Sequence, residues 1–178
     1  MPKPFMNLLD VEISTSRLLL KPISMEYKEA IFSEFTEEIT SYTYPQPAKT
    51  IAETETFIQE SLQGLQAGTN LQLVILLKQT QEFLGCAGLH NLDKQPELGI
   101  WLKKLAHGNR YGREAIAGIK QWAVKNINCD YLTYPVDKQN IASRKIPESL
   151  GGTIVRVNDK QNLAGNTLHL LEYQIPNR

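Results

Sequence analysis

The chain has little cysteine and little histidine. Cys86 and Cys129 are its two cysteines, they lie far apart, and no CxxC pair occurs. The three histidines stand alone in the sequence. Because a zinc ion is bound by clustered Cys and His ligands, the sequence predicts no metal site. The scarcity of cysteine also argues against a disulfide framework and is typical of the reducing cytoplasm, where we expect this protein.

Three further absences narrow the class of protein. No run of 18 apolar residues occurs, so we expect no membrane-spanning helix, and the N-terminus lacks the apolar core of a signal peptide. Lys and Arg number 19, as do Asp and Glu, so no positive excess favours general nucleic-acid binding. A length of 178 residues predicts one domain covering 1–178, with residues 1–10 as a loose leader.

Hydrophobic periodicity predicts alternating strands and helices. Runs typical of strands occur at 17–22, 71–77, 83–89, 97–102, 131–136, 153–157 and 167–175. Helices are predicted at 25–35, from 51 to about 64–68, from about 112 to 126, and at 141–150. Ser24 is expected to cap the first helix, and Thr50 opens a capping box with Glu53. Pro135 is expected to interrupt strand pairing because it has no N–H.

The most informative segment joins the strand at 97–102 to the long helix. Its turn contains Gly108 and Gly112, and four cations flank it: Lys103, Lys104, Arg110 and Arg113. The first N–H groups of a helix lack partners and carry partial positive charge, so phosphate binds there readily. The turn has neither GxxxxGK[ST] nor GxGxxG, which leaves a Walker loop and a Rossmann site unsupported. From the residues alone, a structural helix cap and a site for another phosphate ligand both stay open.

Five blocks in order resemble the GNAT N-acetyltransferases, and among them the RimJ/RimL-like branch of ribosomal-protein alanine/serine N-acetyltransferases. The blocks are SRLLLKP (16–22), FLGCAGLH (83–90), ELGIWL (97–102), GNRYGREA (108–115) and NIASRKIPESLG (140–151). The resemblance implies an α/β (α+β) fold with a mixed, mostly antiparallel sheet of about seven strands. It implies a splay between strands 97–102 and 131–136, and about four flanking helices. It also implies transfer of an acetyl group from acetyl-CoA to a primary amine.

The resemblance further implies where acetyl-CoA binds. The pantetheine arm would pair with the exposed edge of the strand at Ile100, Trp101 and Leu102. The turn before the long helix would hold the pyrophosphate, through His107, Gly108, Asn109, Arg110, Tyr111, Gly112 and Arg113. Asn140 would hold the pantetheine or a bound water, and Ser143 would lie near the thioester sulfur.

Amine acetylation also needs proton transfer, because an amine must be neutral to attack a thioester. Glu97 begins a strand with apolar neighbours, so it is the candidate base, and partial burial would raise its pKa. The N–H of Trp101 or Leu102 is the candidate donor to the oxyanion. Ser143 is the candidate proton donor to the leaving thiolate.

The acceptor is a protein N-terminal α-amine or a small-molecule amine. Tyr42 and Tyr44, in the loop between the first two helices, and Tyr134, on the strand at 131–136, are the candidate residues that line its pocket. Zero net charge gives no preference for basic ribosomal proteins. We expect a monomer or a homodimer.

The chain also departs from the family pattern. Arg110 stands where a second glycine is usual, and we expect it to be helical, because a left-handed arginine costs about 1 kcal/mol or more. Leu105 replaces a polar residue of the turn. Pro147 replaces a tyrosine that acts as general acid in many GNAT enzymes, and Tyr134 is the candidate substitute through water. These departures leave an alternative, a non-catalytic acyl-CoA-binding sensor or partner module.

Overall fold

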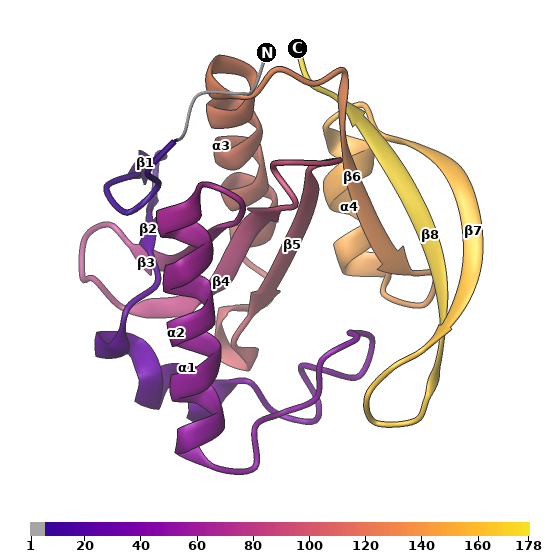
Figure 1. The fold of residues 1–178 in the computed structure, drawn as a ribbon. Coiled ribbons are helices and arrows are strands. Elements are labelled where there is room, and N and C mark those ends of the chain that lie inside the picture. Colours follow the sequence, from indigo (N-terminus) through magenta and orange to yellow (C-terminus); the bar gives the residue numbers. More distant parts are fainter. Residues whose placement is uncertain (1–5) are drawn as a thin grey trace.

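One mixed sheet of eight strands organises residues 6–178, the part of the chain that the computed structural model describes (Figure 1). The strands are β1 (Ile13–Ser14), β2 (Leu18–Pro22), β3 (Leu71–Leu77), β4 (Phe83–His90), β5 (Glu97–Leu102), β6 (Tyr131–Asp137), β7 (Thr153–Gln161) and β8 (Thr167–Pro176). Their order in the sheet is β1-β2-β3-β4-β5-β6-β8-β7, and only β5 and β6 are parallel. The predicted mostly antiparallel sheet is therefore confirmed, and the two-residue β1 adds a strand to the seven expected.

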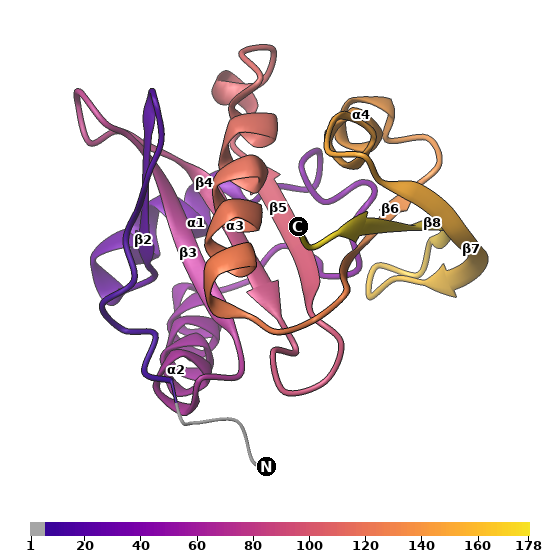
Figure 2. The ribbon, with the colours of Figure 1, turned by 90° about the horizontal axis from the view of Figure 1, so that it is seen from above.

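Four α-helices cover the sheet on its two faces. They are α1 (Lys28–Glu34), α2 (Ile51–Ala67), α3 (Tyr111–Asn126) and α4 (Ile141–Ser149), with short 3-10 turns at Met25–Tyr27 and Lys104–Ala106. Figure 2 shows α3 and α4 on one face and α1 and α2 on the other. Among the described residues, no helix combines the length and the apolar character that crossing a bilayer requires.

The sheet is splayed between β5 and β6 (Figure 1). These strands pair only where Glu97 meets Thr133, whose N–H donates to Pro96 O at 2.9 Å. Successive N–H groups of a strand point to opposite edges, so the nitrogen of Pro135 faces the same edge as that of Thr133. Pairing of β6 with β8 continues through Pro135. The N–H that Pro135 lacks is therefore missing from the edge of β6 that faces β5. The two strands do not pair there, and β5 is left with an open edge.

Regular alternation along β5 assigns its side chains to the two faces. Its pairing with β4 runs from Glu97 to Leu102 without a register shift. The ring of Trp101 lies 4.8 Å from that of Phe35, which follows α1. Glu97, Gly99 and Trp101 thus face α1 and α2, as the two-residue period predicted, while Ile100 and Leu102 face α3.

Local sequence signals explain most helix ends. The Thr50 hydroxyl accepts from Glu53 N–H at 3.3 Å, although the Glu53 carboxylate accepts from Lys49 N–H instead of closing the box on Thr50. Gly68 ends α2 in the left-handed conformation. The prediction that Ser24 caps the first helix is wrong, because its side chain makes no capping bond and a 3-10 turn begins there.

The N-terminal segment packs against α2 from Leu8 onward. Leu8 is fully buried, and its N–H donates to Leu65 O at 3.0 Å. The expected loose leader is therefore wrong for this residue. Residues 1–5 of that predicted leader lie outside the described part of the chain.

Candidate active site

The turn before α3 presents a run of backbone donors. Within residues 6–178, none of the six N–H groups of residues 108–113 donates to a protein acceptor. Gly108 and Arg110 are both left-handed, with φ of +84° and +61°. Successive N–H groups in such turns form anion-binding concavities, and the α3 dipole adds partial positive charge. The sequence prediction of an anion site at this turn therefore has a structural basis.

The expectation that Arg110 is helical is wrong. Arg110 is the N-cap residue of α3, at φ 61° and ψ 22°. A non-glycine residue pays about 1–2 kcal/mol for this conformation because its Cβ crowds the carbonyl oxygen. Contacts elsewhere in the fold must offset this conformational cost. They come from the segment just before β2 and from the first turn of α3.

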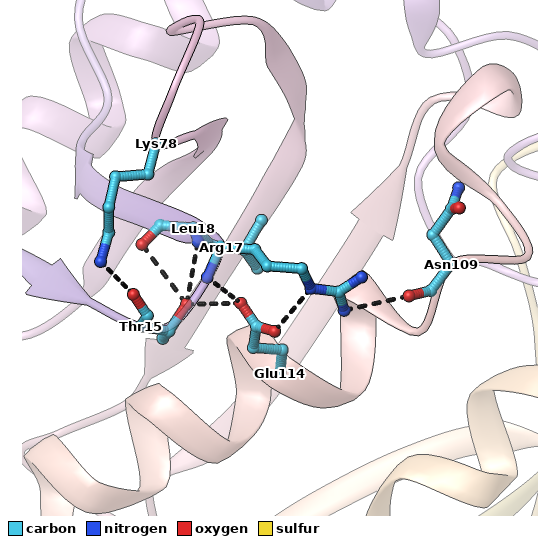
Figure 3. Close-up of polar contacts among 6 residues, drawn as sticks. All are labelled: Thr15, Arg17, Leu18, Lys78, Asn109 and Glu114. Atoms are coloured by element: carbon cyan, nitrogen blue, oxygen red, sulfur yellow. Dashed lines mark hydrogen bonds and ion pairs between the residues drawn. The ribbon is translucent and has the colours of Figure 1, made fainter.

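A hydrogen-bond network anchors the turn to the start of β2 (Figure 3). Arg17 Nε donates to Glu114 Oε1 at 2.9 Å, and Arg17 Nη2 donates to Asn109 O at 3.0 Å. Glu114 Oε2 accepts from Arg17 N–H at 3.0 Å and from the Thr15 hydroxyl at 2.6 Å. The Arg17 guanidinium also stacks 4.6 Å above the ring centre of Tyr111. Glu114 and Arg17 thus fix both ends of the turn before α3.

Glu114 is held in its charged form by this network. Partial burial raises the pKa of the Glu114 carboxyl, but hydrogen bonds from Thr15 and Arg17 and the charge of Arg17 lower it further, so the net shift is downward. Glu114 is therefore a charged anchor at neutral pH.

The four cations around the turn divide into two pairs. Lys103 Nζ lies 3.4 Å from Glu82 Oε1, and Lys104 is paired with Glu38. Within the described chain, Arg110 and Arg113 have no carboxylate partner. These two arginines are the cations left to meet an anionic ligand.

His107 is directed at the backbone of β5. Its Nε2 lies 2.9 Å from Leu102 O. The ring therefore holds the C-terminal end of β5 next to the turn. The imidazole is bonded to protein here, in contrast to the phosphate contact that the sequence suggested for it.

The open edge of β5 lies beside this turn. The carbonyl of Pro96 points toward β6, so the backbone groups of Ile100 and Leu102 point the same way, into the splay. The N–H of Trp101 points to the opposite edge, where it pairs with Cys86 of β4. The prediction that Trp101 N–H could serve the oxyanion is therefore wrong, and Leu102 N–H is left as the candidate.

Helix α4 brings three predicted residues together. Asn140 caps the helix, and its Oδ1 accepts from Ser143 N–H at 3.4 Å. The Ser143 hydroxyl lies 2.6 Å from that of Tyr134 on β6. Burial raises the pKa of Tyr134 to about 12, against the opposing effect of the hydrogen bond with Ser143. Tyr134 is thus a protonated hydroxyl beside Ser143, on the α4 side of the sheet.

The predicted base lies on the other face. Glu97 is half-buried, and burial raises the pKa of its carboxyl; Lys160 opposes that shift and Glu172 adds to it. Lys160 Nζ sits 4.1 Å above the ring centre of Tyr44. Tyr44 O accepts from Leu163 N–H at 3.0 Å, which ties its loop to the turn between β7 and β8. Lys160 therefore contacts Tyr44 directly and acts on Glu97 through its charge.

The structure separates the three tyrosines that were predicted to line the acceptor pocket. Tyr44 lies on the same face of the sheet as Glu97, and Tyr42 is exposed in the same loop between α1 and α2. Tyr134, in contrast, is hydrogen-bonded to Ser143 on the opposite face. Sequence reasoning assigned no role to Arg17 or Glu114. Both residues lie in blocks that carry the family resemblance, and this was the available signal. Their contact could not be predicted from it, because they are 97 residues apart in the sequence.

Comparison with known proteins defines the class. The family model described as Acetyltransferase (GNAT) domain matches residues 17–153. The chain therefore belongs to the GNAT acetyltransferases, and its activity is acetyl-CoA-dependent N-acetyl transfer. A curated relative, the uncharacterized N-acetyltransferase p20 of Bacillus licheniformis, is 23% identical over 140 residues, or 76% of this chain and 79% of the relative.

Solved structures share the fold. RimL, a ribosomal L7/L12 alpha-N-protein acetyltransferase solved with coenzyme A, matches with a TM-score of 0.82 and 16% identity, over 93% of this chain and 98% of RimL. Spermidine N-acetyltransferase from Vibrio cholerae, solved with CoA and spermine, matches with a TM-score of 0.79 and 16% identity, over 91% of this chain and 96% of that enzyme. No group of three His, Cys, Asp or Glu side chains suited to a metal ion occurs among the described residues.

Proposed function

We propose that this chain acetylates a primary amine with acetyl-CoA bound between the turn before α3 and the open edge of β5. The six N–H groups of residues 108–113, which have no acceptor in the described chain, carry this proposal. They suit a pyrophosphate. An extended pantetheine arm can pair, as an added strand would, with the edge of β5 that β6 leaves open, where His107 takes only the carbonyl of Leu102. Arg110 and Arg113 supply the two unpaired positive charges.

The proposed chemistry begins with a proton leaving the acceptor amine. Glu97 takes it, directly or through one water, because its raised pKa makes it a stronger base than an ordinary carboxylate. The amine nitrogen then attacks the thioester carbonyl carbon, forming the C–N bond. Leu102 N–H donates to the oxygen that becomes negative.

Collapse of this intermediate breaks the C–S bond. The thiolate of CoA takes a proton from the Ser143 hydroxyl, and Ser143 regains one from Tyr134, 2.6 Å away. In this scheme Tyr134 supplies the proton that a tyrosine at position 147 supplies in many relatives. Tyr134 is restored by proton exchange with solvent before the next turnover.

The acceptor belongs to one of two classes, and we place the chain in the RimJ/RimL-like branch in the cytoplasm. Two neighbours with the same fold differ in acceptor: RimL is named for a ribosomal protein N-terminus, and the Vibrio cholerae enzyme for spermidine. Tyr42, Tyr44 and Lys160 are the side chains we assign to the mouth of the acceptor site. A panel of N-terminal peptides and polyamines separates the two classes.

Calorimetric titration with acetyl-CoA tests the donor site. We expect micromolar binding that weakens about 5- to 10-fold in Arg110→Ala and in Arg113→Ala, because each removes one charge-assisted contact. Lys125→Ala is the matched control, since it removes an exposed cation from the far end of α3. An absence of binding by the wild-type protein would overturn the proposal. Binding without thiol release across the amine panel would favour the non-catalytic sensor.

A further inference from the structure

His90 is the cross-strand neighbour of Glu97. The two residues are paired in the β4–β5 register. Directly opposed residues of an antiparallel pair point to the same face, with their Cα atoms about 5.5 Å apart. His90 therefore shares the α1/α2 face with the proposed base. The two side chains therefore project from neighbouring backbone positions into the same layer, between the sheet and α2.

Two glycines make room for the imidazole beside Glu97. A Cβ atom on Gly88 would lie 3.2 Å from His90 Nε2, and one on Gly99 would lie 3.6 Å from the same atom. Gly88 and Gly99 face each other in the next row of the sheet. The imidazole thus lies over the Gly88–Gly99 pair, between Glu97 and Trp101. It occupies space that larger side chains at these two positions would fill.

The other side of His90 opens into a small cavity on the α2 side of the sheet. Its volume is about 190 Å³, and it is lined by Phe57, Glu60, Ser61, Asn70, Gln72 and His90. A cavity of this size has room for several waters, and the side chains of Glu60, Asn70 and Gln72 offer them hydrogen-bond partners. Glu60 is exposed on α2, so the cavity connects the inner surface of the sheet with solvent.

The imidazole is available for proton transfer. Within the described residues, neither ring nitrogen of His90 makes a hydrogen bond to protein. Burial lowers the pKa of His90, so the ring is neutral at neutral pH, with one donor and one acceptor nitrogen. The titratable groups around it are Glu97 on β5, with Lys160 and Glu172 acting on that carboxylate, and Glu60 on α2; β3 and the residue before it contribute the amides of Gln72 and Asn70.

We propose that His90 is a positioning residue that relays the proton from Glu97 to the water-accessible cavity beside Glu60. The inference rests on the proposed function, in which Glu97 receives a proton from the amine at each turnover. One ring nitrogen of His90 accepts that proton while the other releases its own toward the cavity. Glu97 returns to its charged form, and the net result is one proton delivered to solvent with no other bond changed.

A titration independent of turnover tests the coupling. The ring pKa of His90 is followed by nitrogen-15 NMR in the wild-type protein and in Glu97→Gln. Removing the negative charge of Glu97 should lower the pKa of His90 by about half a unit or more, because the carboxylate stabilises the imidazolium. An unchanged His90 titration would overturn the relay, whatever the acceptor proves to be.

Turnover supplies the second test. His90→Gln should lower kcat about 10-fold with little change in the KM for acetyl-CoA, since general acid–base steps contribute factors of this size or larger. Imidazole added to His90→Gly should restore part of the rate, which a purely structural role would not predict. His169→Gln is the matched control, because His169 contacts Asp159 at the surface. Unchanged kcat and pH profile in His90→Gln would overturn the proposal, whereas a wild-type protein without transfer to any amine would overturn the proposed function instead.

Discussion

Glu114 anchors the turn before α3, where we propose that the pyrophosphate binds, and Glu114→Gln tests whether the turn depends on that anchor. The substitution retains one carbonyl oxygen, which can still accept from Thr15 and from Arg17 N–H. It replaces the oxygen that accepts from Arg17 Nε with an amide NH₂, so two donors face each other. The Arg17 guanidinium then loses the partner that aims it at Asn109 O.

The magnitude follows from exposure. A hydrogen bond to a charged group contributes about 1.5–3 kcal/mol when desolvated, and an exposed ion pair contributes about 0.2–1 kcal/mol. The side chains of Arg17 and Glu114 are 44% and 20% exposed, so this pair lies between the two limits. We expect a loss of about 1 kcal/mol in unfolding free energy, which lowers Tm by about 2–4 °C for a chain of this size.

Binding should respond as well. The turn must be fixed for its N–H groups to meet a pyrophosphate, so we expect acetyl-CoA affinity to fall about 3- to 10-fold in Glu114→Gln. Calorimetric titration measures it, and thermal unfolding measures stability. Glu55→Gln is the control, because Glu55 makes one exposed ion pair with Lys28 at 3.9 Å. Equal Tm and equal affinity in Glu114→Gln and wild type would refute the anchoring argument.

The same variant predicts a pH dependence. The folded pKa of Glu114 lies below its unfolded value, so its contribution to stability is fully present above the unfolded pKa and is lost as pH falls through the folded pKa. The stability difference between wild type and Glu114→Gln should therefore be constant near neutral pH and shrink in acid. Denaturant unfolding at several pH values measures this, and a difference that grows in acid would contradict the assigned charge state.

Three other variants test the proposed chemistry and the backbone strain. Glu97→Gln should slow thiol release about 100-fold or more without changing CoA affinity. Because burial raises the pKa of Glu97, the wild-type rate should rise with pH through a midpoint above 4.5, the ordinary pKa of a glutamate. The variant should lack this rise. Arg110→Gly should raise the unfolding free energy by up to about 1 kcal/mol, and with it the denaturant midpoint, because glycine adopts the left-handed conformation without strain. The variant should also bind acetyl-CoA more weakly. An unchanged denaturant midpoint would argue against the strain. Ser143→Ala should lower unfolding free energy by about 1–3 kcal/mol by leaving the buried Tyr134 hydroxyl unpaired, and adding Tyr134→Phe should recover part of that loss; additive losses would refute the pairing.

Much of the fold could be predicted because its determinants are local. The period of two along ELGIWL places Glu97, Gly99 and Trp101 on one face whatever the sheet around them. Thr50 and Gly68 bound α2 through contacts within a few residues of themselves. The run of donors at the start of α3 likewise follows from helix geometry, since the first N–H groups of any helix lack intrahelical partners.

The sequence by itself therefore determined the elements, the faces of β5 and the presence of a turn whose N–H groups are left without helical partners. Tertiary structure alone decided what those groups contact. Arg110 is left-handed because the turn is fixed by contacts with β2, and Arg17 meets Glu114 only because α3 packs over that strand. Tyr134 joins Ser143 and not the acceptor side, and His90 stands beside Glu97, because the register and order of distant strands place them there. Such contacts depend on the whole sheet, and no short stretch of sequence encodes them.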